Sequence, residues 1–147
     1  MRRGWLILFL SLVLPLGAAA CNSGPDWGMP AAAKDVPNPV PPTAQNLAAA
    51  EAIYADRCAR CHGDRGAGDG SDASLYKPLP ASLTDDTVRQ TSDGELFWKI
   101  GKGRRPMPGY ESELTAEQRW QLVNLLRTFA AQPTAKPAAE PAAPAAK

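Results

Sequence analysis

Two cysteines and one histidine lie within five residues, Cys58-Ala59-Arg60-Cys61-His62, and this histidine is the only one in the chain. The spacing Cys-x-x-Cys-His is the attachment signature of a c-type haem. Thiols at positions i and i+3 after a helix reach the same side, so both can form thioethers to one porphyrin edge. We therefore predict one covalent haem c, bound through Cys58 and Cys61, with His62 as an iron ligand.

Other uses of this stretch fit less well. A thioredoxin-like redox pair is expected in a βαβ setting, which the sequence lacks, and it would leave His62 unexplained. A structural zinc site needs four ligands, usually in two pairs, and the third cysteine, Cys21, lies far upstream. A short Cys58–Cys61 disulfide remains an alternative.

The sixth iron position is either open or occupied by methionine, because no second histidine exists. After residues 1–20 the methionines are Met29 and Met107. Met107 stands between two prolines in "GRRPMPGY", and prolines stiffen a loop that would otherwise be too mobile to hold a weak thioether ligand. The alternative, methionine as a gap-filler in the core, suits a helix face better. We predict Met107 as the second iron ligand.

Four basic residues precede Met107 within a short stretch: Lys99, Lys102, Arg104 and Arg105. They form either a solvated surface that offsets the haem propionates or a basic rim that steers an acidic redox partner. Over the whole chain, 16 Lys and Arg nearly balance 15 Asp and Glu. This balance implies no nucleic-acid partner.

Three helices are predicted, each opened by a capping residue. They are 44–59 after Thr43, 94–101 after Ser92 and Glu95, and 119–131 after Thr115 and Gln118. Gly101 or Gly103 ends the second helix, Pro133 stops the third, and the third carries an apolar stripe that includes Trp120, Val123 and Leu126. Segments 62–72 and 76–82 read as loops, and no β alternation appears. The predicted fold is all-α, with three to five helices and long loops around one haem.

The N-terminal region predicts export. Residues 1–20 combine two arginines, a short apolar run and small residues, as in a signal peptide; a retained anchor helix is the alternative. Cys21 follows the predicted cut and resembles the lipid-modified first residue of bacterial lipoproteins. Simple cleavage would leave a free thiol, a liability in an oxidising compartment. We expect a periplasmic protein anchored to the membrane through Cys21.

Proline and alanine dominate two further segments. Residues 21–46 form a leader, which through Val36 and Val40 can lie along the domain surface, and 132–147 form a disordered tail. The domain proper is predicted at 47–131. So short a domain buries little surface by itself and usually needs a prosthetic group.

The stretches "YADRCARCHGDRGAGDG", "DGELFWKIGKGRRPMPGY" and "LTAEQRWQLVNLLRTF" resemble the class I mono-haem c-type cytochromes over residues 47–131. The resemblance implies that the first and last helices cross, with haem in a slot bounded by the methionine loop. It implies thioethers at Cys58 and Cys61, with His62 proximal and Met107 distal. One departure is Ala50, where the family often has glycine at the helix crossing.

The resemblance also implies roles for four residues around the haem. Pro78 or Pro80 would lie on the His62 side, where a backbone carbonyl orients the imidazole. Trp98 would approach a haem propionate, and Tyr110 would form a wall of the pocket.

These features predict electron transfer and no enzymatic reaction. With both axial positions filled, no small-molecule substrate reaches the metal, so the haem exchanges single electrons with redox proteins by outer-sphere transfer. The alternative is a tethered electron-transfer subunit of a dehydrogenase, quinol-oxidising or oxidase complex. A gas or redox sensor, in which Met107 dissociates, would normally carry an output domain, which the Pro/Ala tail is not.

Overall fold

The computed structural model describes residues 27–131, and within them the chain is helical, with no β-strand. The elements are η1 (Ala31–Asp35), α1 (Ala44–Arg57), α2 (Ala59–His62), η2 (Ala73–Leu75), α3 (Asp86–Gln90), α4 (Asp93–Lys102) and α5 (Ala116–Ala131). The predicted all-α fold class is confirmed. No helix of this part of the chain is long and apolar enough to span a bilayer.

The three predicted helices are α1, α4 and α5, and each begins at its predicted cap. The caps are hydrogen bonds from Asn46 N to Thr43 Oγ1 (3.2 Å), Glu95 N to Ser92 Oγ (3.3 Å) and Gln118 N to Thr115 Oγ1 (3.2 Å). In the second and third, the Glu95 and Gln118 side chains accept hydrogen bonds from the backbone in return, which completes two capping boxes. The helix α4 ends at Gly103, the later of the two predicted stops.

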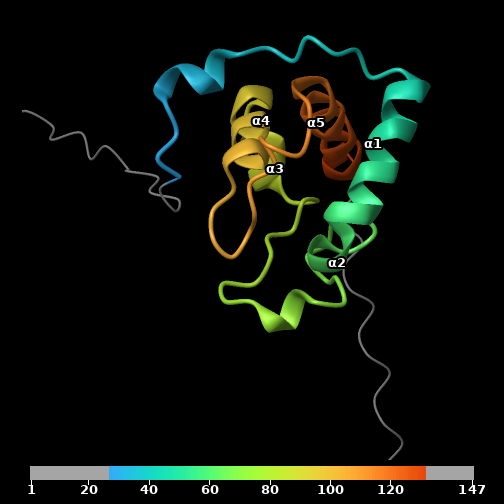
Figure 1. Ribbon diagram of the computed structural model, residues 1–147, viewed down its shortest axis with the longest axis vertical. Helices are drawn as coiled ribbons and strands as arrows, with labels where there is room; N and C mark the ends of the chain where they lie inside the picture. Colours follow the sequence, from blue (N-terminus) through green and yellow to red (C-terminus); the bar gives the residue numbers. More distant parts are fainter. Residues whose placement is uncertain (1–26, 132–147) are drawn as a thin grey trace, which may run out of the picture.

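The core is built around α5, against which α1, α3 and α4 all pack (Figure 1). Every residue from 119 to 126 is buried, and Val123 is fully enclosed. On α1, Ala50 and Tyr54 are buried in the same hydrophobic cluster. The small Ala50 side chain, with 0% exposure, lets the two helices approach closely.

The leader covers the remaining side of this core. From η1 beside α4 it runs over the end of α5 to the start of α1 (Figure 1). Asn38 secures it, because its side-chain amide donates to the Trp120 carbonyl (3.1 Å) and to Asn124 Oδ1 (2.9 Å). Asn124 in turn donates to the carbonyl of Val40 (2.9 Å). Residues 27–43 are therefore packed on the helical domain along its surface.

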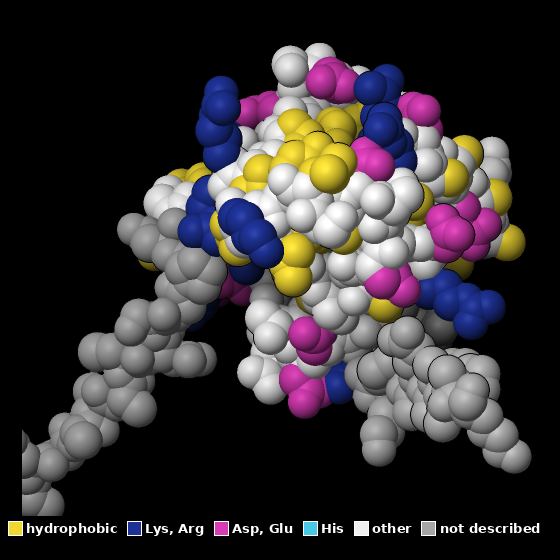
Figure 2. Space-filling view, turned by 90° about the horizontal axis from the view of Figure 1, so that it is seen from below, with side chains coloured by type: hydrophobic (Ala, Val, Ile, Leu, Met, Phe, Trp, Pro, Cys, Tyr) yellow, Lys and Arg dark blue, Asp and Glu magenta, His cyan; other side chains and the backbone are white. Residues whose placement is uncertain are grey.

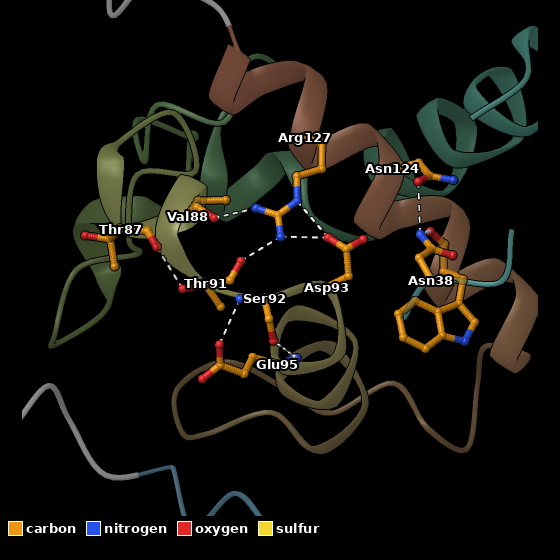
Figure 3. A network of polar contacts seen from close by, with 10 residues as sticks. Asn38, Thr87, Val88, Thr91, Ser92, Asp93, Glu95, Asn124 and Arg127 are labelled. Atoms are coloured by element: carbon orange, nitrogen blue, oxygen red, sulfur yellow. Dashed lines mark hydrogen bonds and ion pairs between the residues drawn. The ribbon is translucent and has the colours of Figure 1, made fainter. Parts of the chain in front are cut away.

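A second polar network joins α3, α4 and α5 (Figure 3). The guanidinium of Arg127 donates to Asp93 Oδ1 (2.8 Å) and to the carbonyls of Val88 (2.7 Å) and Thr91 (2.6 Å). One α5 side chain thus satisfies carbonyls at the end of α3 and the charge at the start of α4. A carboxylate in the first turn is also favoured by the helix dipole.

Several predictions from the sequence concern residues outside the described range. The signal peptide, the lipidation of Cys21, the stop at Pro133 and the tail 132–147 all lie there.

Candidate functional site

A cavity of about 480 Å³ opens where α1 meets α2. Its walls come from this junction, from the loop 76–81, from the loop 104–110 and from Trp27 of the leader. Cys58, Cys61, His62 and Met107 all line it, although the sequence separates the first three from Met107 by more than forty residues. On the face that Figure 2 shows from below, apolar side chains gather near the middle, and Lys and Arg side chains lie on either side of them.

The two thiols are presented by a break between helices. Cys58 is the C-cap of α1, and α2 begins directly after it. Cys61 N (3.1 Å) and His62 N (2.9 Å) donate hydrogen bonds to the Cys58 carbonyl. Both cysteines are free and half-buried. Burial raises the pKa of the Cys58 thiol to about 11, and the nearby Cys61 makes a smaller contribution in the same direction. A reactive redox cysteine needs a lowered pKa, and burial moves the pKa of Cys58 in the opposite direction.

The histidine is fixed in one tautomer by the backbone. His62 Nδ1 lies 3.0 Å from the carbonyl oxygen of Ala81. Because a carbonyl can only accept, Nδ1 carries the proton and Nε2 keeps its lone pair for a metal. Burial lowers the pKa of His62, against the opposing effect of the Ala81 hydrogen bond, and so favours the neutral form that binds metals.

The orienting carbonyl belongs to the residue after Pro80, which the sequence did not single out. Pro78 and Pro80 themselves line the cavity on this side. The loop between His62 and these prolines depends on Gly63, whose φ of +79° ends α2 in a conformation that favours glycine. Its carbonyl accepts a hydrogen bond from the Tyr54 hydroxyl (2.7 Å), which ties the loop to the core.

Met107 is carried by a tight turn. Arg104 N donates to the Met107 carbonyl (3.0 Å), and Met107 N donates to the Arg104 carbonyl (2.9 Å). The two arms of the loop touch at Gly103 and Gly109, where an added Cβ on either would strike the opposite backbone. Glycine at both positions therefore lets the loop close and present Met107 toward the cavity.

The two aromatic residues with expected haem contacts lie in different places. Tyr110 lines the cavity, is 9% exposed, and donates its hydroxyl to the Arg57 carbonyl (2.9 Å). Burial raises the pKa of Tyr110 to about 12. Trp98 is half-buried on α4 and is not among the residues that line the cavity. Trp27, which the sequence did not single out, lines the cavity instead.

The four basic residues before Met107 do not form one free patch. Arg104 and Arg105 line the cavity mouth, whereas Lys102 pairs with Glu111 at 2.6 Å. Lys99 is half-buried, and burial lowers its pKa while the charge of Glu95 opposes this. Of the four residues, only Arg104 and Arg105 therefore line the cavity.

These residues fit a covalent haem. The cavity combines two free thiols, an imidazole with Nε2 available and a thioether from a separate loop, within a mainly apolar lining. Within residues 27–131, no three His, Cys, Asp or Glu side chains are grouped so that they could hold a metal ion without such a cofactor.

An all-helical domain with Cys-x-x-Cys-His at an apolar cavity defines a c-type cytochrome. A model of the family described as "Cytochrome C oxidase, cbb3-type, subunit III" matches residues 45–126, and the chain belongs to this family. The resemblance to class I mono-haem c-type cytochromes is thereby confirmed. A comparison with curated proteins gives no match.

A solved structure supports the same fold. The chain is similar to a chain of the Kuenenia stuttgartiensis reducing HAO-like protein complex Kustc0457/Kustc0458, with a TM-score of 0.55 and 28% identity. That match covers 62% of this chain and 46% of the other, so this chain spans less than half of the relative's length. The KustC0563 c-type cytochrome matches with a TM-score of 0.47 and 26% identity, over 54% of this chain and 95% of that one.

Proposed function

We propose that the chain is a mono-haem cytochrome that carries single electrons by outer-sphere transfer between periplasmic or membrane-bound redox proteins. Membership in the cytochrome c family implies covalent haem and electron transfer. The observation that carries the finer proposal is the meeting of Cys58, Cys61, His62 and Met107 in one cavity. Outer-sphere transfer does not require a substrate to bind at the iron.

Each of these residues has a distinct part. Haem, when bound, supplies a one-electron iron couple. Cys58 and Cys61 would hold the haem covalently and so retain it when the iron changes oxidation state. The Ala81 carbonyl orients the His62 ring for ligation, and Met107 would supply a thioether, a ligand type that favours reduced iron and raises the potential.

Arg104 and Arg105 add a docking role to this site. They are the basic residues of the expected rim that border the cavity. A positive rim steers an acidic partner to the place where electrons leave, and it affects the association rate more than the affinity.

A second candidate is a tethered electron-transfer subunit of an oxidase, dehydrogenase or quinol-oxidising complex. The matching family is described as an oxidase subunit, and the Kuenenia relative is part of a complex. Lipidation of Cys21 would suit either role. Trp27 comes six positions after Cys21, and a chain of that length spans at most about 22 Å, so a lipid on Cys21 would keep the cavity mouth near the membrane.

The first test is an absorption spectrum of the haem-loaded protein, oxidised and reduced, with and without CO. A thioether-haem pyridine spectrum, a far-red sulphur-to-iron band and no CO shift would support the carrier. A rapid CO shift without the sulphur band would overturn Met107 ligation and bring a gas sensor forward. Co-purification of the lipidated protein with a membrane complex would favour the subunit.

A further inference from the structure

Among the leader residues that the structure describes, Trp27 is the one that lines the cavity. Two cations lie over its indole ring: Arg104 Cζ is 5.0 Å and Lys99 Nζ is 5.7 Å from the ring centroid. Both distances are within the range of a cation–π attraction, for which tryptophan is the best acceptor. The leader therefore meets the helical domain at the cavity as well as at α5.

The position of Arg104 makes this contact consequential. Arg104 is the residue whose backbone pairs with Met107 in the tight turn, through bonds of 2.9 and 3.0 Å. Its side chain is exposed and makes no ion pair within residues 27–131. The ring of Trp27 is thus a side-chain contact at the Arg104 end of the turn, while Gly103 and Gly109 close its base.

Trp27 is itself held in place by the rest of the leader. The η1 turn packs against α4, where the Ala33 carbonyl and Val36 lie over Gly94. Further along, Asn38 is hydrogen-bonded to α5. Both contacts lie on the C-terminal side of Trp27 and fix the segment that carries its ring, so the ring can restrain a loop.

We propose that Trp27 is a positioning residue for the second axial ligand: by stacking on Arg104 it keeps the turn that carries Met107 against the cavity. The leader is then a working part of the haem site rather than a spacer. This inference rests on the proposed ligation by Met107. It predicts that loss of the ring loosens the turn and lets an external ligand displace the thioether.

The test compares the haem-loaded wild type with Trp27→Ala, Trp27→Phe and Lys34→Ala. Imidazole, which competes for the sixth position, is titrated into the ferric proteins, and hydrogen exchange is followed in peptides spanning 103–110. Trp27→Ala should raise the imidazole affinity and the exchange rate roughly fivefold, as expected for losing one or two cation–π contacts. Trp27→Phe should restore most of the difference.

Lys34→Ala is the matched control, because it trims an exposed leader side chain that does not line the cavity and has no ion pair or hydrogen bond within residues 27–131. It should leave imidazole affinity unchanged even where it lowers the melting temperature. Arg104→Ala should raise affinity by itself but add little to Trp27→Ala, since both remove the same contact.

The outcomes separate the two proposals. Unchanged exchange at 103–110 in Trp27→Ala overturns the positioning role whatever the ligation. Faster exchange with unchanged imidazole affinity also overturns it. If the wild type lacks the sulphur-to-iron band, Met107 is rejected as the ligand, and with it the ligand-positioning role. Faster exchange in Trp27→Ala would then still establish the contact between Trp27 and the turn.

Discussion

The hydroxyl of Tyr110 donates to the carbonyl of Arg57 at 2.9 Å and so joins the two walls of the cavity. Tyr110 follows the Met107 loop, and Arg57 is the last residue of α1, directly before Cys58. The last carbonyls of a helix lack partners within it, so this bond satisfies a group that would otherwise need water. It also sets the spacing between the methionine loop and the thiols.

Replacing Tyr110 with Phe removes this bond and keeps the ring. We expect a loss of about 1 kcal/mol in the free energy of unfolding at pH 7, the usual net value of a half-buried hydrogen bond. Denaturant titration of the haem-loaded protein measures it. A loss below about 0.3 kcal/mol would show that water replaces the hydroxyl at no cost.

The same residue predicts a pH dependence. Burial raises the pKa of Tyr110 from 10.0 to about 12, so the unfolded chain releases this proton first as the pH rises. The stabilisation is complete below pH 10 and disappears between about pH 10 and 12. Tyr54, whose pKa burial also raises, acts in the same direction. Unfolding free energies measured from pH 9 to 12 should fall less steeply in Tyr110→Phe than in the wild type.

The sequence predicts best what depends on neighbouring residues. Helix caps work over three or four positions, which is why Thr43, Ser92 and Thr115 mark the starts of α1, α4 and α5. The Cys-x-x-Cys-His spacing is equally local, and two flanking prolines distinguish Met107. The cavity then brings together residues that the sequence could only nominate separately.

The features that the sequence does not predict depend on contacts between residues far apart in the chain. The apolar stripe of α5 predicts one buried face, yet Asn124, on another face, is also buried because Asn38 and Val40 of the leader cover it. Nothing in the spacing shows that Asn38 meets α5, more than eighty residues later. Likewise the carbonyl that orients His62 can belong to any residue of the loop, and α3 is too short to show periodicity.

The docking of η1 on α4 gives a prediction in which helix propensity and packing oppose each other. Alanine in place of Gly94 should favour an isolated helix by about 1 kcal/mol. In the folded protein its Cβ would strike the Ala33 carbonyl and approach the Val36 carbonyl, so η1 must move away. We expect Gly94→Ala to raise hydrogen exchange in peptides covering 29–40. Unchanged protection together with higher stability would mean that the leader adjusts without detaching.

Arg127 provides a prediction about stability alone. Replacing it with Leu leaves the Asp93 carboxylate and the carbonyls of Val88 and Thr91 without their donor. Because the pair is about one-third exposed, water compensates in part, and we expect a loss of about 2 kcal/mol. Thermal unfolding measures it. Arg65→Leu, at an exposed loop position, is the control and should change stability by less than about 0.5 kcal/mol.

Removing the thioether tests the ligand assignment directly. Met107→Ala should abolish the far-red band, allow CO to bind the reduced protein, and lower the potential by on the order of 100 mV, within the roughly 0.8 V that axial ligands span. Redox titration and CO difference spectra check these effects. Met29→Ala is the matched control, because Met29 does not line the cavity. If Met29→Ala alone reproduced the changes, the ligand would come from the leader.

The docking role of the cavity rim predicts a dependence on salt. Arg105 is exposed at the cavity mouth and has no ion pair or hydrogen bond within residues 27–131, so its charge is available to a partner. Electron exchange with an acidic redox protein should slow as ionic strength rises from about 0.01 to 0.15 M, because screening shortens the range of attraction. Arg105→Gln should lower the low-salt rate constant roughly twofold and flatten this dependence.

Arg65→Gln removes the same charge from a loop that does not line the cavity, so it separates local steering from net charge. Stopped-flow kinetics at several salt concentrations distinguish the two variants. If both slow exchange equally, the overall charge of the protein attracts the partner and no docking face exists at the rim. If only Arg105→Gln does, electrons leave where Arg104 and Arg105 border the cavity, and the partner carries acidic residues around its own redox centre.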